Sequence, residues 1–149
     1  MKQYIGAKII MAEPAYRVDG KVFAKANIAP CGYKIEDGYK VVYPDGYESW
    51  SPKDVFEAAY RATDGMNFGL AIEAAKMGKK IARAGWNGKN QYVELASSIS
   101  YKNGAGEIVN VGHAAIGNKA LAFVGTSGVQ MGWLASQADM LADDWKIVV

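Results

Sequence analysis

The chain has 149 residues, with 17 Lys and Arg against 15 Asp and Glu, one histidine and one cysteine. A net charge of +2 lacks the basic excess of nucleic-acid-binding domains, so we expect no DNA or RNA partner; one cysteine and one histidine exclude a disulfide framework and thiolate- or histidine-rich metal centres. No apolar run approaches the roughly 20 residues that span a bilayer, and the first residues lack the apolar region of a secretory signal, so we expect no membrane partner.

The first part of the chain predicts a strand followed by a hairpin. Residues 4–12 are apolar and rich in isoleucine, as in a strand, whereas prolines and glycines predict irregular structure over residues 13–37. Two short strand-like segments, 38–43 and 47–50, flank Pro44–Asp45–Gly46. Proline presets φ and glycine accepts a positive φ, so this tripeptide predicts the turn of a hairpin.

A helix is predicted over residues 52–62. The Ser51 hydroxyl can cap its first turn, and Pro52 suits the first helical position. An acidic residue follows three residues after the serine, as in a capping box.

The tripeptide Thr63–Asp64–Gly65 predicts a joint between two parts of the chain. Residues 1–65 are expected to form an N-terminal strand-hairpin-helix extension, and residues 66–149 a second domain. Asn67 is placed to cap a helix over residues 68–77, which the following glycine ends in the left-handed conformation.

The sequence of the rest of the second domain predicts mainly short strands. Gly85–Trp86–Asn87–Gly88 predicts a turn between two of them, and Ser136–Asp139 repeats the capping-box pattern before a helix of about two turns. A polar, glycine-rich segment predicts a long loop or ragged hairpin. The fold class is therefore α+β, mainly antiparallel sheet with two or three short helices. The expected strands are 79–84, 90–96, 120–124, 129–134 and 145–148, with residues 97–118 as the loop or hairpin.

A cationic stretch over residues 76–89 is the first candidate site. It contains lysines and an arginine beside Trp86 and Asn87, with Tyr92 just beyond. Such a segment can hold a phosphate while an aromatic ring stacks on a base, although a solvated charged face is the simpler explanation. The flanking glycines let a ligand approach the backbone, and the alternative is an ordinary hairpin turn whose tryptophan folds onto the sheet.

A polar group near the end of the chain is the second candidate. Its carboxylates can accept ribose hydroxyls, although capping a helix and ending it in solvent is the simpler role. Neither His113 nor Cys31 has the partners of a catalytic nucleophile or base, and no paired acids suggest general acid–base chemistry. We therefore expect no enzyme, no catalytic residues, no metal and no cofactor. The members of this polar group are Gln137, Asp139, Asp143 and Asp144.

Two segments in this order resemble a known family. Met66–Lys89 (MNFGLAIEAAKMGKKIARAGWNGK) and Trp133–Trp145 (WLASQADMLADDW) are similar to the opening and closing segments of the second Thoeris anti-defence family of small phage proteins. The resemblance implies a protein that sequesters cyclic ADP-ribose isomers made by TIR-domain defence enzymes, without cleaving them. It also implies a homotetramer with ligand pockets between protomers, acting in the cytoplasm of the infected bacterial host.

Some members of that family hold cyclic dinucleotides, the signals of CBASS defence, at a separate site, and the resemblance extends this expectation to the present chain. Two other functions stay open: an enzyme that hydrolyses such signals, and a protein–protein inhibitor of a bacterial defence component. Stacking is expected from the aromatic residues, hydrogen bonds from the amides and carboxylates, and phosphate binding from the cations. The expected ligand-binding residues are Asn67, Phe68, Arg83, Trp86, Asn87, Gly88, Lys89, Tyr92, Trp133, Gln137, Asp139 and Met140.

Overall fold

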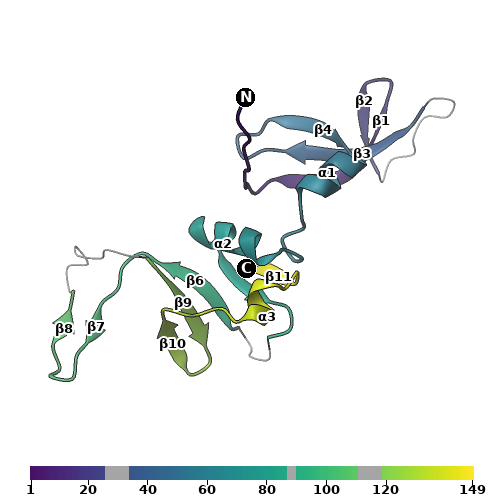
Figure 1. Cartoon of the computed structure of the whole chain (residues 1–149). Helices are drawn as coiled ribbons and strands as arrows, with labels where there is room; N and C mark the ends of the chain where they lie inside the picture. Colours follow the sequence, from purple (N-terminus) through teal and green to yellow (C-terminus); the bar gives the residue numbers. More distant parts are fainter. Residues whose placement is uncertain (26–33, 87–89, 111–118) are drawn as a thin grey trace. The chain divides into compact units, whose positions relative to one another are not determined.

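The computed structural model describes residues 1–25, 34–86, 90–110 and 119–149 (Figure 1). The chain divides into two compact units, Met1–Arg61 and Ala62–Val149. The described strand pairings are antiparallel, and three short helices accompany them, so the predicted α+β class with mainly antiparallel sheet is confirmed. The predicted ligand-binding residues Asn87, Gly88 and Lys89 lie outside the described residues, as do Cys31 and His113.

The first unit is a four-stranded sheet with one helix beside it. The strand order is β2-β1-β3-β4, and the predicted hairpin turn joins the last two strands. Gly46 has a φ of +86°, and the Tyr43 N–H donates to the Tyr47 carbonyl at 2.9 Å, as the turn requires. The elements are β1 (Met11–Val18), β2 (Lys21–Ala24), β3 (Glu36–Val42), β4 (Glu48–Pro52) and α1 (Lys53–Ala59).

The predicted strand at residues 4–12 begins too early, and the irregular segment predicted over residues 13–37 is wrong where β1, β2 and the start of β3 lie; its residues 26–33 are outside the described part of the chain. Strand β1 begins at Met11 and runs through Pro14 to Val18, and β2 follows. In an antiparallel ladder the N and O of one residue point to the same neighbouring strand, and the Pro14 carbonyl accepts from Lys25 N–H on the β2 side. The β1–β2 register stops at Ala15, so the missing proline N–H breaks no ladder bond.

The predicted start of α1 also needs correction. Ser51 and Pro52 are the last residues of β4, and the helix begins at Lys53. Pro52 occupies the N-cap position with no side-chain cap, because β4 keeps the backbone extended up to that residue. The Ser51 hydroxyl donates instead to the Pro52 carbonyl at 3.4 Å, and the helix ends at Ala59, three residues earlier than predicted.

The second unit contains a five-stranded sheet in the order β10-β9-β6-β5-β11 and a separate two-stranded hairpin, β7-β8. The predicted strands are confirmed, and the hairpin lies within the segment predicted as a loop or ragged hairpin. The strands are β5 (Lys80–Arg83), β6 (Tyr92–Ala96), β7 (Tyr101–Lys102), β8 (Ile108–Val109), β9 (Ala120–Gly125), β10 (Gly128–Met131) and β11 (Trp145–Val148).

Both helices of the second unit begin at side-chain caps. Asn67 Oδ1 accepts the Leu70 N–H at 2.9 Å at the start of α2 (Phe68–Lys76), and Gly78 follows it with a φ of +83°, both as predicted. Ser136 and Asp139 form the predicted capping box of α3 (Gln137–Met140). This helix is a single turn rather than about two, because the chain then turns back to pair β11 with β5.

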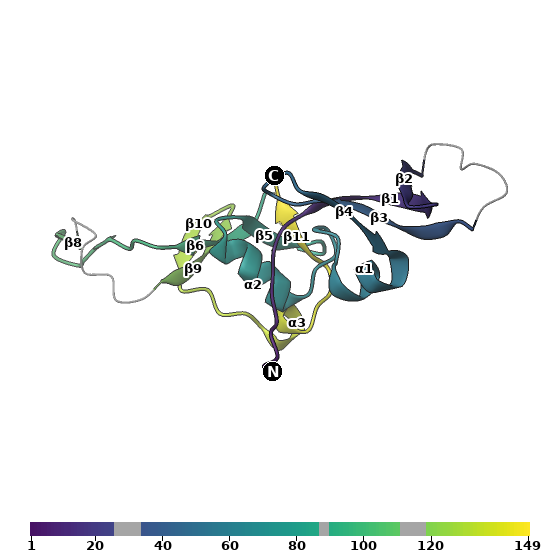
Figure 2. The ribbon, with the colours of Figure 1, turned by 90° about the horizontal axis from the view of Figure 1, so that it is seen from above.

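The core of the second unit lies between α2 and one face of the sheet (Figure 2). Trp145, Ile81, Val93 and Ala71 are completely buried there. The backbone N–H and carbonyl of Met66 exchange hydrogen bonds of 2.8 and 3.0 Å with those of Trp145. The two ends of the unit therefore meet at its centre, and residues from both ends can contribute to one site.

Candidate functional site

Trp86 belongs to a cluster of aromatic rings in the second unit. Its ring lies edge-on to Phe123, Trp133 and Trp145, with centroid separations of 5.4, 5.9 and 5.4 Å. Phe68, at the start of α2, has its ring centroid 5.5 Å from that of Trp145. Trp145 is completely buried but Trp86 is only half-buried, so part of its ring remains accessible to a ligand.

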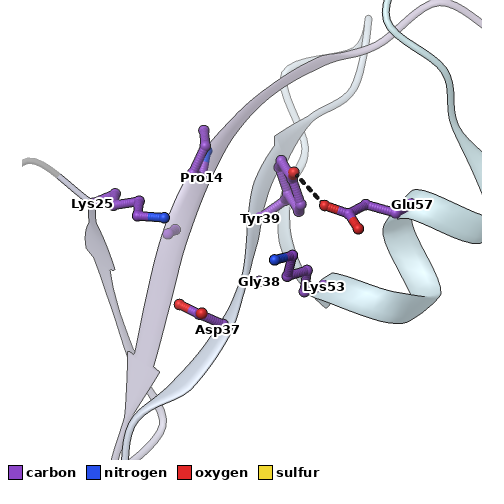
Figure 3. Close-up of a pocket in the computed structure, with 8 residues that line it drawn as sticks. Pro14, Lys25, Asp37, Gly38, Tyr39, Lys53 and Glu57 are labelled. Atoms are coloured by element: carbon purple, nitrogen blue, oxygen red, sulfur yellow. Dashed lines mark hydrogen bonds between the residues drawn. The ribbon is translucent and has the colours of Figure 1, made fainter.

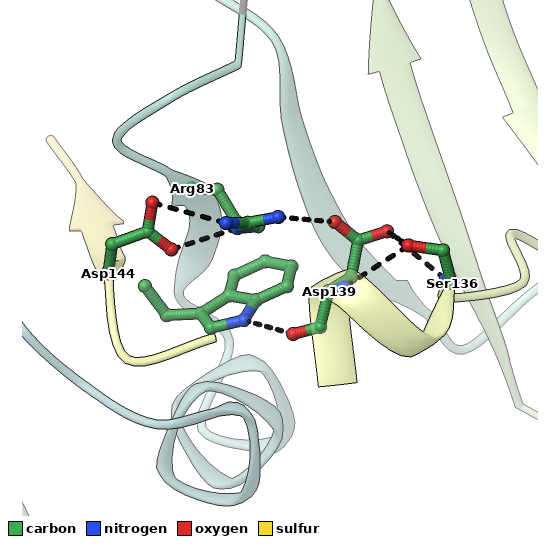
Figure 4. A network of polar contacts seen from close by, with 5 residues as sticks. Arg83, Ser136, Asp139 and Asp144 are labelled. Atoms are coloured by element: carbon green, nitrogen blue, oxygen red, sulfur yellow. Dashed lines mark hydrogen bonds and ion pairs between the residues drawn. The ribbon is translucent and has the colours of Figure 1, made fainter. Parts of the chain in front are cut away.

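Arg83, the last residue of β5, binds two aspartates from the C-terminal part of the chain, Asp139 and Asp144 (Figure 4). Its Nε donates to Asp144 Oδ1 at 2.8 Å and its Nη2 to Asp144 Oδ2 at 3.4 Å, while Nη1 donates to Asp139 Oδ1 at 3.1 Å. The guanidinium therefore has carboxylates on two edges. The three side chains together carry a net charge of −1.

Asp139 has several hydrogen bonds besides its bond to Arg83. Its Oδ2 accepts from the Ser136 N–H at 3.1 Å and from the Ser136 hydroxyl at 2.8 Å, and its backbone carbonyl accepts the Trp145 indole N–H at 2.8 Å. Burial opposes ionisation of the carboxyl group, but hydrogen bonds from Ser136, Arg83 and Trp86 outweigh it and lower the pKa of Asp139. Asp139 is thus a fixed anion that connects α3 with Arg83.

Asp144 is the more exposed of the two carboxylates. Its side chain is 38% exposed, against 16% for Asp139. The hydrogen bond from Arg83 lowers the pKa of Asp144, and the two carboxylates raise the pKa of Arg83, the Asp144 hydrogen bond most strongly. All three groups are therefore charged at neutral pH.

The structure brings several of the predicted site residues around this network. Phe68 and Trp133 join the ring cluster, and Arg83 pairs with Asp139 while its own backbone carbonyl accepts the Trp86 N–H at 3.4 Å. Three further predicted residues are exposed at the two helices that contribute Phe68 and Asp139. Asn67 caps α2, and Gln137 and Met140 lie on α3.

Tyr92 lies on the face of the five-stranded sheet opposite to the one that packs against α2. Its neighbour Val93 is buried and pairs with Phe123, and successive side chains of a strand point to opposite faces. The Tyr92 ring has the ammonium of Lys80 above it, 4.6 Å from the centroid. Within one protomer, therefore, Tyr92 and Trp86 do not share a face.

Two lysines of the predicted cationic stretch already have partners. Lys76 forms a 2.7 Å ion pair with Glu73, and Lys80 covers Tyr92. Arg83 is bound by its two aspartates, so the stretch is not a row of free cations in its described part.

The first unit contains a separate small cavity (Figure 3). Its volume is about 100 Å³, and Lys25, Asp37 and Lys53 surround it. Ligand pockets for nucleotide-sized molecules are usually about 300–1,000 Å³. The cavity is thus too small to enclose a cyclic nucleotide.

The sequence analysis named Asp144 in the second candidate group, with solvent exposure as the simpler role, but not among the expected ligand-binding residues. It did not consider Phe123 or Trp145 for the site. Trp145 is buried in the core, and Phe123 packs against it. Nothing local in the sequence signals the pairing of Asp144 with Arg83, because 61 positions separate them.

Neither a metal cluster nor a membrane span emerges from the described ranges. They contain no group of three or more His, Cys, Asp or Glu side chains arranged to hold a metal ion. No helix among them is long and apolar enough to cross a membrane.

The comparisons with known proteins address the same part of the chain. Residues 66–148 match the family model of the Thoeris anti-defense 2-like domain, described as Tad2-like, and this match covers more than half of the sequence. The chain belongs to this family. It is also similar to Thoeris anti-defense 2 of Bacillus phage SP01, with 40% identity over 88 residues that cover 56% of this chain and 94% of the relative. The family and the relative together support a phage anti-defence role.

Proposed function

We propose that the protein binds cyclic ADP-ribose isomers made by TIR-domain enzymes and keeps them, uncleaved, from the defence effector inside the infected bacterial cell. Membership of the Thoeris anti-defense 2-like family and the similarity to a phage protein support this role. The two candidate segments of the sequence, around Trp86 and around Asp139, both lie within the matched residues.

The observation that carries the proposal is the half-buried Trp86 beside Arg83. A cyclic ADP-ribose presents a purine face, ribose hydroxyls and a diphosphate. The accessible part of the Trp86 ring suits the purine, and the planar guanidinium suits the phosphates. The exposed amide of Gln137 is available for a hydroxyl group.

The ligand site is completed by a second copy of the chain in this proposal. Tight capture of a small ligand needs an enclosed pocket, and two protomers can enclose a ligand more fully than one. The second unit exposes large apolar side chains, with Val129 61%, Leu134 89% and Leu141 78% exposed. Val129 lies on β10, an edge strand of the five-stranded sheet. Exposed apolar groups and an edge strand with one neighbour among the described strands are suited to association between protomers, which supports the proposed homotetramer.

Calorimetric titration tests the proposal. The full-length protein is titrated with each cyclic ADP-ribose isomer, with linear ADP-ribose as the matched control, and with a panel of cyclic dinucleotides for the proposed second site. The proposal expects at least one cyclic ADP-ribose isomer to bind with a Kd in the nanomolar range, equivalent to roughly 12 kcal/mol. Absence of binding to every isomer, together with co-purification of a defence protein, would favour the protein–protein inhibitor instead.

A further inference from the structure

The two carboxylates that hold Arg83 differ in how firmly each is itself held. Asp139 lies in the capping box of α3, and its Oδ2 accepts two hydrogen bonds from Ser136. The Asp144 side chain accepts two hydrogen bonds from Arg83, with the backbone of Asp144 and Gly85 beside it, and is more than twice as exposed, at 38% against 16%. If one carboxylate leaves the guanidinium, the more exposed Asp144 regains water more easily, whereas Asp139 is also held by Ser136.

Asp144 also occupies the edge of Arg83 that best suits a phosphate. It binds side-on, with its two oxygens on Nε and Nη2 at 2.8 and 3.4 Å. Arginine holds phosphate groups through the same pair of parallel N–H donors. Asp139 contacts Nη1 alone and leaves this edge free.

We propose that Asp144 is a specificity-determining residue: it covers the phosphate-binding edge of Arg83 in the free protein, and a phosphate of the ligand replaces it there. This inference rests on the proposed function, since it concerns the same site. A ligand without a phosphate brings no negative charge to pair with the Arg83 guanidinium, so it does not displace the Asp144 carboxylate. The exchange therefore selects anionic ligands, and the remaining bond to Asp139 keeps the guanidinium in place.

The variant Asp144→Asn removes the competing charge and keeps the size of the side chain. Asp143→Asn is the matched control, because Asp143 is the adjacent residue and is exposed. Asp144→Ser provides a second variant in case the asparagine disturbs the fold, which thermal unfolding reports. The probes are inorganic pyrophosphate and the cyclic ADP-ribose isomers.

The first measurement follows the Arg83 Nε–H resonance by NMR while pyrophosphate is added. The exchange predicts that this resonance shifts on titration, and that Asp144→Asn saturates at about three- to tenfold lower pyrophosphate than the unmodified protein. Asp143→Asn stays within twofold of the unmodified protein. An Arg83 resonance that never responds, or equal or weaker binding by the Asp144 variants, would overturn the proposal, since Asp144 would then only position the arginine.

The second measurement separates this inference from the proposed function. Calorimetry with the cyclic ADP-ribose isomers should show tighter binding by Asp144→Asn in the same three- to tenfold range. If pyrophosphate displaces Asp144 but no isomer binds any form of the protein, the exchange stands and the proposed function fails. If the isomers bind all forms equally, the proposed function stands and the exchange is wrong.

Discussion

Arg83 and Asp144 meet side-on through two hydrogen bonds of 2.8 and 3.4 Å, although 61 positions separate them in the sequence. The backbone supports the same meeting, because the Ala84 N–H donates to the Asp144 carbonyl at 3.0 Å. The segment that leads from β5 to Trp86 is therefore attached to the residue just before β11. This attachment orients the ring on which the proposed stacking depends.

Removing either member of the proposed recognition pair should weaken ligand binding. We expect Arg83→Ala and Trp86→Ala each to reduce the affinity for the preferred cyclic ADP-ribose isomer at least tenfold, equivalent to about 1.4 kcal/mol. The guanidinium and the accessible ring are the groups that would contact phosphate and purine. Calorimetry measures the effect, and exposed Lys79→Ala serves as the control. Unchanged affinity in both variants would remove the assignment.

Asn67 offers a test that separates a structural role from ligand contact. Because its side chain caps α2 through Leu70 N–H, Asn67→Ala should lower the free energy of unfolding by about 1 kcal/mol. Asn67→Ser retains a capping oxygen and should keep most of that stability. Urea unfolding gives both values. A serine variant that folds normally but binds ligand poorly would indicate direct contact by Asn67, whereas equal stability in all three forms would rule out the cap as a stabilising feature.

The carboxylates of the network predict a particular pH dependence. The pKa values of Asp139 and Asp144 are lowered in the folded protein, so their stabilising effect is complete above the ordinary aspartate pKa of about 3.9. It is lost as the pH falls below that value toward the lowered ones. Thermal unfolding should therefore show a higher Tm for the unmodified protein than for Asp144→Asn at pH 5, and a much smaller difference near pH 2.5. A difference that does not change with pH would contradict the assigned charges.

Gly38 provides a test of packing in the first unit. A Cβ atom at this position of β3 would overlap the ring of Trp50 and the carbonyl of Ser51 on β4. Gly38→Ala should therefore destabilise this unit by roughly 1–3 kcal/mol. Hydrogen exchange of the β3 amides in the full chain should become faster, while exchange in β5 and β6 stays the same. Unchanged protection of β3 would show that the sheet adjusts without cost.

The sequence predicted the helix caps and the hairpin turn correctly, because each depends on residues only a few positions apart. The capping bonds of Asn67 and of the Ser136–Asp139 box join residues three positions apart, and the turn at Pro44–Gly46 needs only its own residue types. The strand through Pro14 was missed because a proline breaks a ladder only when its N–H side faces a paired strand. That depends on where β2 ends, which the local sequence does not reveal.

The candidate site could be predicted in its chemistry but not in its contacts. The sequence indicated Arg83, Trp86 and Asp139 from their residue types, and the structure brings these three together. It could not indicate that Asp144 also binds Arg83, since that pairing follows from the antiparallel register of β5 with β11. The same register pairs Trp145 with Arg83, three residues before Trp86.

Recovery of the bound signal tests the central claim most directly. The purified protein is incubated with the isomer that calorimetry selects, separated from free ligand, and denatured by heat, and the released nucleotide is analysed by mass spectrometry. Non-covalent capture predicts that the cyclic molecule is released intact, in a constant ratio to the protein. Release of linear or hydrolysed products that accumulate with incubation time would instead show that the protein is an enzyme and contradict the claim.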